Sequence, residues 1–462
     1  MKTVLLSGGS GKRLWPLSND SRSKQFLKVL DNNGDGLQSM LQRVWKQLER
    51  QDLVHSSVLT TSKVQVEMIY SQLESDINLI VEPSRRDTFP AIALAASYIY
   101  SVQKCSLDEV IVVLPVDPYV EDEFFSRIKE LEYTLKISDA DIALMGVRPT
   151  YPSEKYGYIV PKAFNNTEGN YFNVDYFTEK PNKEKASFLI KKHALWNCGV
   201  FAFKLKYLIS LMEKMNIPTE YNQLLVEYNN LPKISFDYEV VEKTDNIVAI
   251  SYDGYWKDLG TWNTLTEEMS INKIGKGVIS QDCTNVHLIN ELEIPVTVNG
   301  ISDVIVAVSP DGILVSDKEA SPKIKEVVNI FDDRPMYEER RWGWYRILDY
   351  NKLDSGQEIL TKKICILEGK NLSYHYHEYR DEIWTIIDGE GEIIFNNQIQ
   401  KLRAGDVVKI NSGEKHSIIA NTNLEIIEVQ KGSQLIEADI VRVFEKWEEI
   451  MSNVINSNVQ SV

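Results

Sequence analysis

The sequence predicts an α/β amino-terminal domain, a short β-rich connecting domain and an all-β carboxyl-terminal domain. Strand and helix patterns alternate over residues 1–268, which is typical of a mixed, mostly parallel sheet covered by helices on both faces. Short apolar pieces separated by turns follow over residues 269–334, and strand patterns continue through residues 335–462 until a last helix. A chain of 462 residues is too long for one hydrophobic core, which agrees with this division.

The composition is that of a soluble globular protein without a nucleic-acid partner. Hydrophobic residues make up 43% of the chain and charged residues 26%, and the formal net charge is −16. Nucleic-acid-binding proteins carry basic stripes, which this acidic chain lacks. The first strand begins almost at residue 1, and no apolar run approaches the roughly 20 residues of a membrane span. We therefore expect a cytoplasmic protein with no membrane partner.

A glycine-rich turn follows the first strand and predicts a phosphate-binding loop. Residues 4–9 read Val-Leu-Leu-Ser-Gly-Gly, and with Gly11 they place three glycines in four positions, so that backbone N–H groups can face an anion. Neither common nucleotide motif matches, because Arg13 replaces the third glycine of Gly-x-Gly-x-x-Gly and the P-loop ending is absent. Five cations lie in this stretch: Lys12, Arg13, Arg22, Lys24 and Lys28. Positive charge gathered in an acidic chain predicts a small polyanionic ligand.

Helices and strands alternate after this turn. Helical periodicity marks residues 37–50, 63–73 and 90–100, and strand patterns mark residues 57–61, 78–83 and 110–114. Because ligands of such sheets bind at the carboxyl ends of the strands, the polar residues that end the strands are candidate site residues.

Two of these strand ends carry candidate ligand-binding residues. Asp117 follows the apolar strand 110–114, where a carboxylate near a phosphate is a candidate Mg²⁺ ligand. The arginine pair 85–86 and the start of helix 90–100 could contact a base or a phosphate. Turn formation by Asp117 and helix capping by Asp87 are the structural alternatives.

Several segments, in order, resemble the sugar-1-phosphate nucleotidylyltransferases, and in particular their mannose-1-phosphate guanylyltransferase branch. The matching segments are Arg-Leu-Trp-Pro-Leu-Ser (13–18), Lys-Gln-Phe-Leu (24–27), Tyr-Gly-Tyr-Ile (156–159), Phe-Thr-Glu-Lys-Pro (177–181), Trp-Asn-Cys-Gly-Val-Phe (196–201) and Trp-Lys-Asp-Leu-Gly-Thr-Trp (256–262). The resemblance implies a Rossmann-like domain that converts GTP and mannose 1-phosphate to GDP-mannose and pyrophosphate, and we expect a homodimer.

The resemblance also implies roles for individual residues. It implies that Arg13, Lys24, Asp117 and Asp258 are catalytic and that Asp117 and Asp258 bind Mg²⁺. The nucleotide is expected at Leu6, Gly8, Gly9, Ser10, Gly11, Lys12, Glu82, Arg86, Asp87 and Thr88. The sugar phosphate is expected at Gly157, Glu179, Lys180 and Asn197. In this scheme Lys24 and Lys180 hold the two reacting phosphates.

Two other functions fit parts of the sequence. Asp87 and Pro118 stand where the family more often has Asn and His, so another nucleotide or sugar, such as a heptose 1-phosphate, is an alternative. A degenerate regulatory subunit is the other, and the intact catalytic set argues against it.

The connecting residues resemble the partial β-helix that links domains in the guanylyltransferases. Its strand patterns lie at residues 277–280, 286–289, 305–308 and 312–316. A polar, proline-marked break at residues 332–335 predicts the next domain boundary.

The last domain carries a dense group of candidate metal ligands. His375 and His377 stand two apart on an expected strand and so face the same side, while Glu382 and His416 come from neighbouring strands. This set suits a divalent transition metal such as Zn²⁺, Mn²⁺, Co²⁺ or Ni²⁺. A polar cluster without metal is the alternative.

The spacing of these residues resembles the two cupin motifs, and the segment resembles the phosphomannose isomerase half of bifunctional isomerase/guanylyltransferases. For an isomerase, Arg380 or Arg442 could bind the substrate phosphate, and Glu378 and Lys409 are candidate bases by position. The domain departs from those isomerases at His375, where they usually carry Gln, and their terminal Tyr-Gly-Arg is absent. An active isomerase and a metal-binding domain without that activity are therefore both open.

Overall fold

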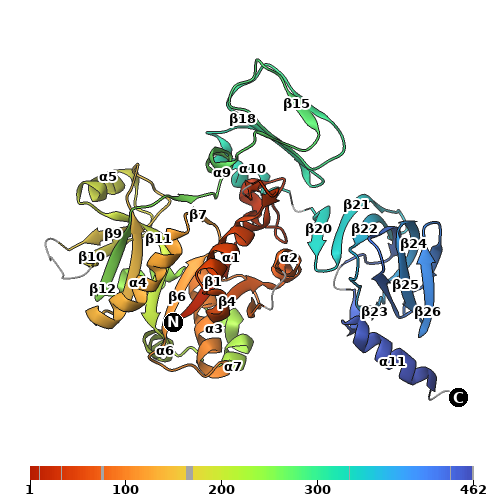
Figure 1. Ribbon diagram of the computed structural model, residues 1–462, viewed down its shortest axis with the longest axis horizontal. Coiled ribbons are helices and arrows are strands. Elements are labelled where there is room, and N and C mark those ends of the chain that lie inside the picture. Colours follow the sequence, from red (N-terminus) through yellow and green to blue (C-terminus); the bar gives the residue numbers. More distant parts are fainter. Residues whose placement is uncertain are drawn as a thin grey trace.

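The computed structural model describes residues 1–9, 11–32, 34–73, 77–162, 170–331, 333–436 and 439–459. Figure 1 shows an amino-terminal domain built around one large sheet, a small β-rich domain (green) beside it, and a carboxyl-terminal β domain (blue) followed by a helix. None of the helices in these ranges has the length and apolar character required to span a membrane.

The amino-terminal domain is built on a nine-stranded mixed sheet of order β5-β4-β1-β6-β11-β8-β12-β10-β9. Its strands are β1 (Lys2–Ser7), β4 (Ser57–Ser62), β5 (Leu79–Glu82), β6 (Val110–Pro115), β8 (Ile142–Val147), β9 (Tyr158–Pro161), β10 (Phe172–Thr178), β11 (Leu195–Lys204) and β12 (Ile247–Tyr252). The pairings β5–β4–β1–β6 and β8–β12 are parallel, as the strand–helix alternation predicts. β11 lies antiparallel between β6 and β8, and β9 and β10 also pair antiparallel.

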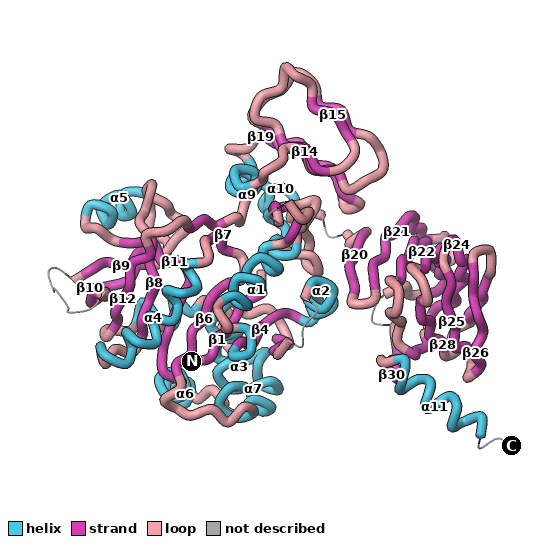
Figure 2. Tube along the Cα trace, viewed as in Figure 1, coloured by secondary structure: helices cyan, strands magenta, loops and turns pink. Residues whose placement is uncertain are grey.

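Helices cover both faces of this sheet because alternate strand residues bury on opposite sides. Leu5 of β1 belongs to the core under α1, α2, α4 and α5, whereas its neighbour Val4 belongs to the core under α3, α6, α7 and α8. The helices are α1 (Met40–Arg50), α2 (Val66–Gln72), α3 (Thr88–Ser97), α4 (Glu123–Ser138), α5 (Lys183–Lys191), α6 (Leu205–Lys214), α7 (Tyr221–Glu227), α8 (Phe236–Glu239) and α9 (Trp262–Glu268). Figure 2 shows α1, α3, α4 and α6 beside the strands of this sheet.

The helix expected over residues 37–50 begins later than the periodicity suggests, because Ser39 caps it. The Ser39 hydroxyl accepts a hydrogen bond from the Gln42 N–H at 3.1 Å, and the Gln42 side chain accepts one from the Ser39 N–H at 3.1 Å. The two residues before the cap form β3 (Leu37–Gln38), which pairs with β2 (Leu30–Asp31).

The middle domain has the expected β-helix-like form. Strands from successive turns of the chain pair in parallel, β14 with β16 and β16 with β18, and β15 pairs in parallel with β17. Their bounds are β14 (Lys273–Ile274), β15 (Gly277–Ile279), β16 (His287–Asn290), β17 (Val296–Val298), β18 (Val304–Ser309) and β19 (Gly312–Asp317), followed by α10 (Ile324–Val328).

The carboxyl-terminal domain packs two antiparallel sheets around a core that includes Trp384, Ile418 and Ile426. The first sheet holds β20 (Tyr337–Arg340), β21 (Gly343–Lys352), β22 (Glu358–Ile366), β29 (Leu424–Gly432), β24 (Arg380–Asp388) and β27 (Val407–Ile410). The second holds β26 (Gln398–Arg403), β25 (Glu390–Phe395), β28 (His416–Ala420), β23 (Tyr374–Tyr376) and β30 (Val441–Phe444). The chain then continues into α11 (Trp447–Val459).

Polar contacts fasten the segment after the glycine-rich turn to the other two domains. The Arg22 guanidinium donates to both carboxylate oxygens of Glu291, at 2.9 and 2.8 Å. The Asn19 amide donates to Asp311 at 2.7 Å, and Asp311 also accepts the backbone N–H of Met336 at 2.6 Å. The nucleotide-loop segment, the β-helix-like domain and the start of the last domain therefore meet at one place.

Candidate active sites

The glycine-rich turn connects β1 to a short 3-10 helix, η1 (Gly11–Leu14). Gly9 has a φ of 120°, which favours glycine, and a Cβ at Gly11 would overlap the carbonyl oxygen of Asn19. Among the described residues no atom lies within 4 Å of a Cβ built on Gly8 or Gly9, so a ligand can approach this backbone closely. Ser10, also expected to contact the nucleotide, lies outside the described residues.

The predicted catalytic residues come together beside this turn. The Lys24 ammonium lies 2.7 Å from Asp117 and 3.2 Å from Asp258. Asp117 follows β6, and Asp258 reaches the same place because β13 (Trp256–Asp258) pairs antiparallel with β7 (Pro118–Val120). A Cβ at Gly260 would lie 3.0 Å from Asp258 and 3.1 Å from Lys24, so the backbone approaches this group closely.

The charges of these residues stabilise one another. Burial alone would lower the pKa of Lys24, but the carboxylates of Asp117 and Asp258 outweigh it and raise this pKa above its usual range. Burial would raise the pKa of Asp258, yet Lys24 and Arg13 together hold it below its usual value. Two carboxylates whose oxygens converge on one cation are a donor set that fits Mg²⁺, which prefers oxygen ligands.

The other residues expected at the nucleotide have partners within the protein. Glu82 is buried and accepts the Tyr228 hydroxyl at 2.7 Å, and burial raises the pKa of Glu82. Asp87 caps α3 by accepting the Thr88 N–H at 2.8 Å. Leu6, near the end of β1, is half-buried.

The contacts of three more of these residues reach other segments. The Arg86 guanidinium donates to the Leu231 carbonyl at 2.7 Å, and the Thr88 hydroxyl accepts the Phe236 N–H at 2.8 Å. The Lys12 ammonium donates to the Phe331 carbonyl at 2.9 Å. Lys12 therefore reaches the segment that leads to the last domain. The charge of Arg13, by contrast, acts to lower the pKa of Lys24 and that of Asp258.

The four residues expected at the sugar phosphate form a second group in the same domain. Lys180 pairs with Glu179 at 2.7 Å, and the Asn197 N–H donates to the Gly157 carbonyl at 2.8 Å. A Cβ at Gly157 would lie 2.5 Å from a carboxylate oxygen of Glu179, so glycine is required for this approach.

Asp237 joins this group, although sequence reasoning assigned it no role. It accepts the Asn197 side-chain amide at 2.8 Å. Burial, with the negative charge of Glu179 adding to it, raises the pKa of Asp237 to about 7. Its neighbours in sequence are typical of a helix start, so the sequence gives no sign that this half-buried carboxyl group lies beside Asn197.

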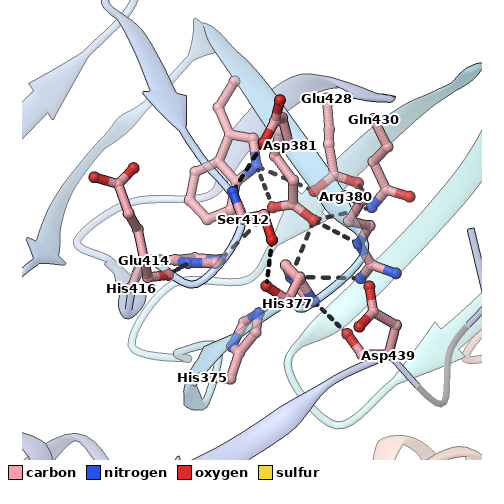
Figure 3. Close-up of polar contacts among 12 residues, drawn as sticks. His375, His377, Arg380, Asp381, Ser412, Glu414, His416, Glu428, Gln430 and Asp439 are labelled. Carbon is pink, nitrogen blue, oxygen red and sulfur yellow. Dashed lines mark hydrogen bonds and ion pairs between the residues drawn. The ribbon is translucent and has the colours of Figure 1, made fainter. Parts of the chain in front are cut away.

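The last domain brings three histidines together, as Figure 3 shows. Ligand nitrogens of His375, His377 and His416 all lie within 4.8 Å of one another, and all three residues are buried. His375 lies opposite His416 where β23 pairs with β28, which explains how residues distant in sequence converge.

The second nitrogens of these rings are held by the backbone. The Nδ1 atoms of His375, His377 and His416 lie 2.7, 2.5 and 3.0 Å from the carbonyls of Ser373, Asp439 and Glu414. An Nδ1–H that donates to a carbonyl leaves the Nε2 lone pair free for a metal. Nε2 of His416 is buried without a hydrogen-bond partner in the described part of the chain. Burial and the neighbouring rings lower the pKa of His375 well below its usual value, which keeps this imidazole neutral. The residues present therefore fit a transition metal.

Glu382 lies next to the three histidines but has other partners too. One oxygen lies 3.0 Å from Nε2 of His377 and accepts Nε of Arg380 at 3.1 Å. The other lies 3.6 Å from Nε2 of His416 and accepts the Trp384 indole N–H at 3.1 Å. The predicted ligand Glu382 and the predicted cation Arg380 are thus an ion pair at the wall of the site.

A cavity of about 90 Å³ opens beside His375 and His377. Its wall includes His375, His377 and Glu382, and four arginines and one lysine also line it: Arg340, Arg341, Lys362, Arg380 and Arg442. Arg442 lies opposite His375 where β23 pairs with β30. The positive charges and the histidines of this wall suit an anionic ligand that also contacts a bound metal.

Two wall residues received no role from the sequence, although they lie in a strand that resembles the isomerase half: Glu428 and Gln430 of β29. Both are buried, at 4% and 2% exposure. Burial raises the pKa of Glu428 to about 7, and the charge of Glu382 adds to this shift. By contrast, Glu378 and Lys409, the candidate bases by position, are exposed and do not line the cavity.

Comparisons with known proteins match both halves of the chain. The family model described as nucleotidyl transferase matches residues 2–273, and that of the mannose-6-phosphate isomerase C-terminal domain matches residues 333–445. A mannose-1-phosphate guanylyltransferase of Salmonella montevideo is 30% identical over 96% of this chain and 98% of its own length. The xanthan biosynthesis protein XanB of Xanthomonas campestris pv. campestris (strain B100) is 29% identical over 95% of this chain and 97% of its own.

A solved structure supports the fold of the first two domains. The crystal structure of the mannose-1-phosphate geranyltransferase from Thermus thermophilus aligns with a TM-score of 0.60 and 28% identity, over 72% of this chain and 100% of that one. The chain is therefore an enzyme of the nucleotidyl transferase family, related along its whole length to mannose-1-phosphate guanylyltransferases and carrying a mannose-6-phosphate isomerase C-terminal domain.

Proposed function

We propose that this protein transfers a guanylyl group from GTP to mannose 1-phosphate, forming GDP-mannose and releasing pyrophosphate. The observation that carries the proposal is the group formed by Lys24, Asp117 and Asp258 beside the open glycine-rich turn. Relatives named mannose-1-phosphate guanylyltransferase, similar over nearly the full chain, support the choice of substrates.

The reaction requires positioning and positive charge rather than a covalent group on the protein. A phosphate oxygen of the sugar phosphate attacks the α-phosphorus in line, and the bond from that phosphorus to the pyrophosphate oxygen breaks. The N–H groups of the turn around Gly8 and Gly9 bind the triphosphate, and Arg13 offsets charge that develops at the α-phosphate. Lys24 and Lys180 each hold one of the reacting phosphates.

Asp117 and Asp258 would hold Mg²⁺ in this scheme. When bound there, the ion would supply positive charge to the α-phosphate and the leaving pyrophosphate. Lys24, which lies between the two carboxylates, orients both of them and, together with Arg13, holds the pKa of Asp258 below its usual value.

The test is an initial-rate panel of four nucleoside triphosphates against mannose, glucose and heptose 1-phosphates. We expect the highest kcat/KM for GTP with mannose 1-phosphate. A higher value for a heptose 1-phosphate or another nucleotide would replace these substrates and keep the reaction type. No transfer with any pair would favour a regulatory subunit.

For the last domain we propose a divalent transition metal held by His375, His377, His416 and Glu382, and the interconversion of fructose 6-phosphate and mannose 6-phosphate. Arg442, opposite His375 on the cavity side, is our choice for the substrate phosphate. The metal would polarise the sugar carbonyl. A metal-binding domain without isomerase activity is the competing proposal, favoured by the departures at His375 and at the chain end.

Bound metal is measured in the purified protein and in the His375→Ala/His377→Ala variant, and interconversion is then assayed with each divalent ion added back. Metal in the wild type only, with interconversion, supports both proposals. Metal without interconversion removes the isomerase, and a metal-free wild type removes the site.

We also propose a cytoplasmic homodimer. Light scattering on the purified protein tests the oligomeric state, and a mass near 53 kDa, that of one chain, would contradict a dimer.

A further inference from the structure

Two buried carboxylates, Glu382 and Glu428, share two hydrogen-bond donors at the wall of the cavity. The Trp384 indole N–H lies 3.1 Å from one oxygen of Glu382 and 3.0 Å from one of Glu428. The Gln430 amide nitrogen lies 3.1 Å from Glu382 and 2.9 Å from Glu428. Figure 3 shows Glu428 and Gln430 of this group near His377. The same two donors therefore hold both carboxylates at the cavity wall, one on β24 and one on β29.

The two carboxylates differ in what else binds them. Glu382 also contacts Nε of Arg380 and Nε2 of His377, so its lone pairs are engaged by a fixed cation and by the proposed metal site. Glu428 lies opposite Lys362 of β22 and Trp384 of β24 in the strand pairing. Glu428 is therefore the carboxylate that a metal does not require.

Gln430 supplies a second, independent sign of a ligand. Its side-chain oxygen is buried and has no hydrogen-bond partner among the described residues, although its amide nitrogen has two. A buried acceptor without a donor costs free energy unless a ligand or water supplies one. Because Glu428 and Gln430 stand two apart on β29, both face the cavity. A hydroxyl group of a sugar is a donor of the right kind.

We propose that Glu428 moves the proton between adjacent carbons of a hexose 6-phosphate in this cavity, and that the Gln430 side-chain oxygen positions the substrate by accepting one of its hydroxyls. This inference rests on the isomerase activity proposed above. It assigns the acid–base role, for which the sequence offered only Glu378 and Lys409, to a residue inside the site.

The chemistry balances without an oxidant or reductant. Starting from the open-chain aldose, the Glu428 carboxylate takes the proton from C2, and the C–H electron pair forms the C1–C2 double bond. The π pair of the C1 carbonyl moves to O1, which takes the proton of the O2 hydroxyl. The Glu428 carboxyl group then gives its proton to C1, where the double-bond pair forms the new C–H bond, and the electron pair left on O2 forms the carbonyl at C2. Glu428 lines the cavity and is held there by the Trp384 indole and the Gln430 amide, so its carboxylate has a fixed position from which to take and return the proton.

The test compares Glu428→Gln with the wild-type full chain, both loaded with the metal that supports interconversion. Interconversion rate, deuterium incorporation from D₂O into the sugar, bound metal and guanylyl transfer are measured on the same samples. We expect Glu428→Gln to lose interconversion and deuterium incorporation together, by about a hundredfold or more, because this is the usual contribution of a general base. Bound metal and guanylyl transfer should not change.

Glu425→Gln is the matched control, since Glu425 lies on the opposite face of β29 and pairs with Lys363 at 2.8 Å. It should interconvert at the wild-type rate. Glu428→Asp keeps a carboxylate and should retain more activity than Glu428→Gln, which separates proton transfer from packing if the Gln variant binds metal poorly. For Gln430→Leu we expect KM to rise more than kcat falls.

Three outcomes overturn these assignments at different levels. A wild type that binds metal but does not interconvert the hexose phosphates overturns both the isomerase and the role of Glu428. An active wild type with an equally active Glu428→Gln overturns the role of Glu428 alone. An unchanged KM in Gln430→Leu overturns the hydroxyl contact.

Discussion

The ammonium of Lys24 lies 2.7 Å from an oxygen of Asp117. The same ammonium lies 3.2 Å from an oxygen of Asp258, which comes from a distant segment of the chain. Without Lys24 the two carboxylates would repel each other in a largely buried place. The lysine thus holds both acids in position for binding a cation, and it keeps the pKa of Asp258 below its usual value.

We expect Asp117→Ala and Asp258→Ala each to lower guanylyl transfer at least a hundredfold when magnesium is limiting, because each removes an oxygen ligand. The rate is measured as a function of Mg²⁺ concentration, and circular dichroism checks the fold. Asp253→Ala, at the exposed Asp253–Arg148 pair, is the control and should keep wild-type turnover. Wild-type turnover of both variants at low magnesium would show that the metal assignment is wrong.

Arg13→Ala should lower kcat more than it weakens GTP binding. The guanidinium acts on the charge that grows as the α-phosphorus becomes five-coordinate, and losing one such contact costs about 3 kcal/mol, or about a hundredfold in kcat. Single-turnover rates and the Kd for GTP separate the two effects. An equal loss in both would make Arg13 a ground-state contact only.

Asp237→Asn should make the stability of the amino-terminal domain less dependent on pH. The folded protein keeps a proton on Asp237 up to about pH 7, whereas the unfolded chain releases it near 3.8, so the folded state binds more protons between these values. Wild-type stability therefore falls as pH rises through this window, and the amide removes this contribution.

The measurement is Tm at pH 5 and at pH 8 for the wild type, for Asp237→Asn and for Asp245→Asn. Asp245 is exposed, and its variant should show the same fall in Tm as the wild type. If the Asp237→Asn variant loses as much Tm as the wild type between the two pH values, Asp237 is ionised in the folded state.

Removing the metal should destabilise the last domain. A ligand bound only by the folded state stabilises by about 2.7 kcal/mol at a hundred times its Kd, so dialysis against a chelator should lower the Tm of this domain and adding back the metal should restore it. His416→Ala should have a low Tm that the chelator no longer changes. His55→Ala, at an exposed histidine of the first domain, should respond to the chelator as the wild type does. A wild-type Tm that the chelator leaves unchanged would argue against a bound metal.

Local features of the sequence determined much of the architecture and of both sites. The three-glycine turn after an apolar strand could be predicted because it depends on backbone conformation and short-range spacing. His375 and His377 could be placed on one face because the side chains of a strand alternate between its two faces. The end of an apolar strand indicated Asp117, and the resemblance to the guanylyltransferases indicated Asp258; the structure brings both within reach of one lysine.

Only the tertiary structure decided which side chains face one another across distant segments. Several features depend on contacts between segments far apart in the sequence. They are the antiparallel insertion of β11, the partners of Lys12 and Glu82, the surroundings of Asp237, and the donors that Glu382 and Glu428 share. Glu428 appears in the sequence as one acid in an apolar strand. Its surroundings become visible only when β24 and β29 pair, because hydrogen bonds, burial and charge depend on distance in space rather than distance along the chain.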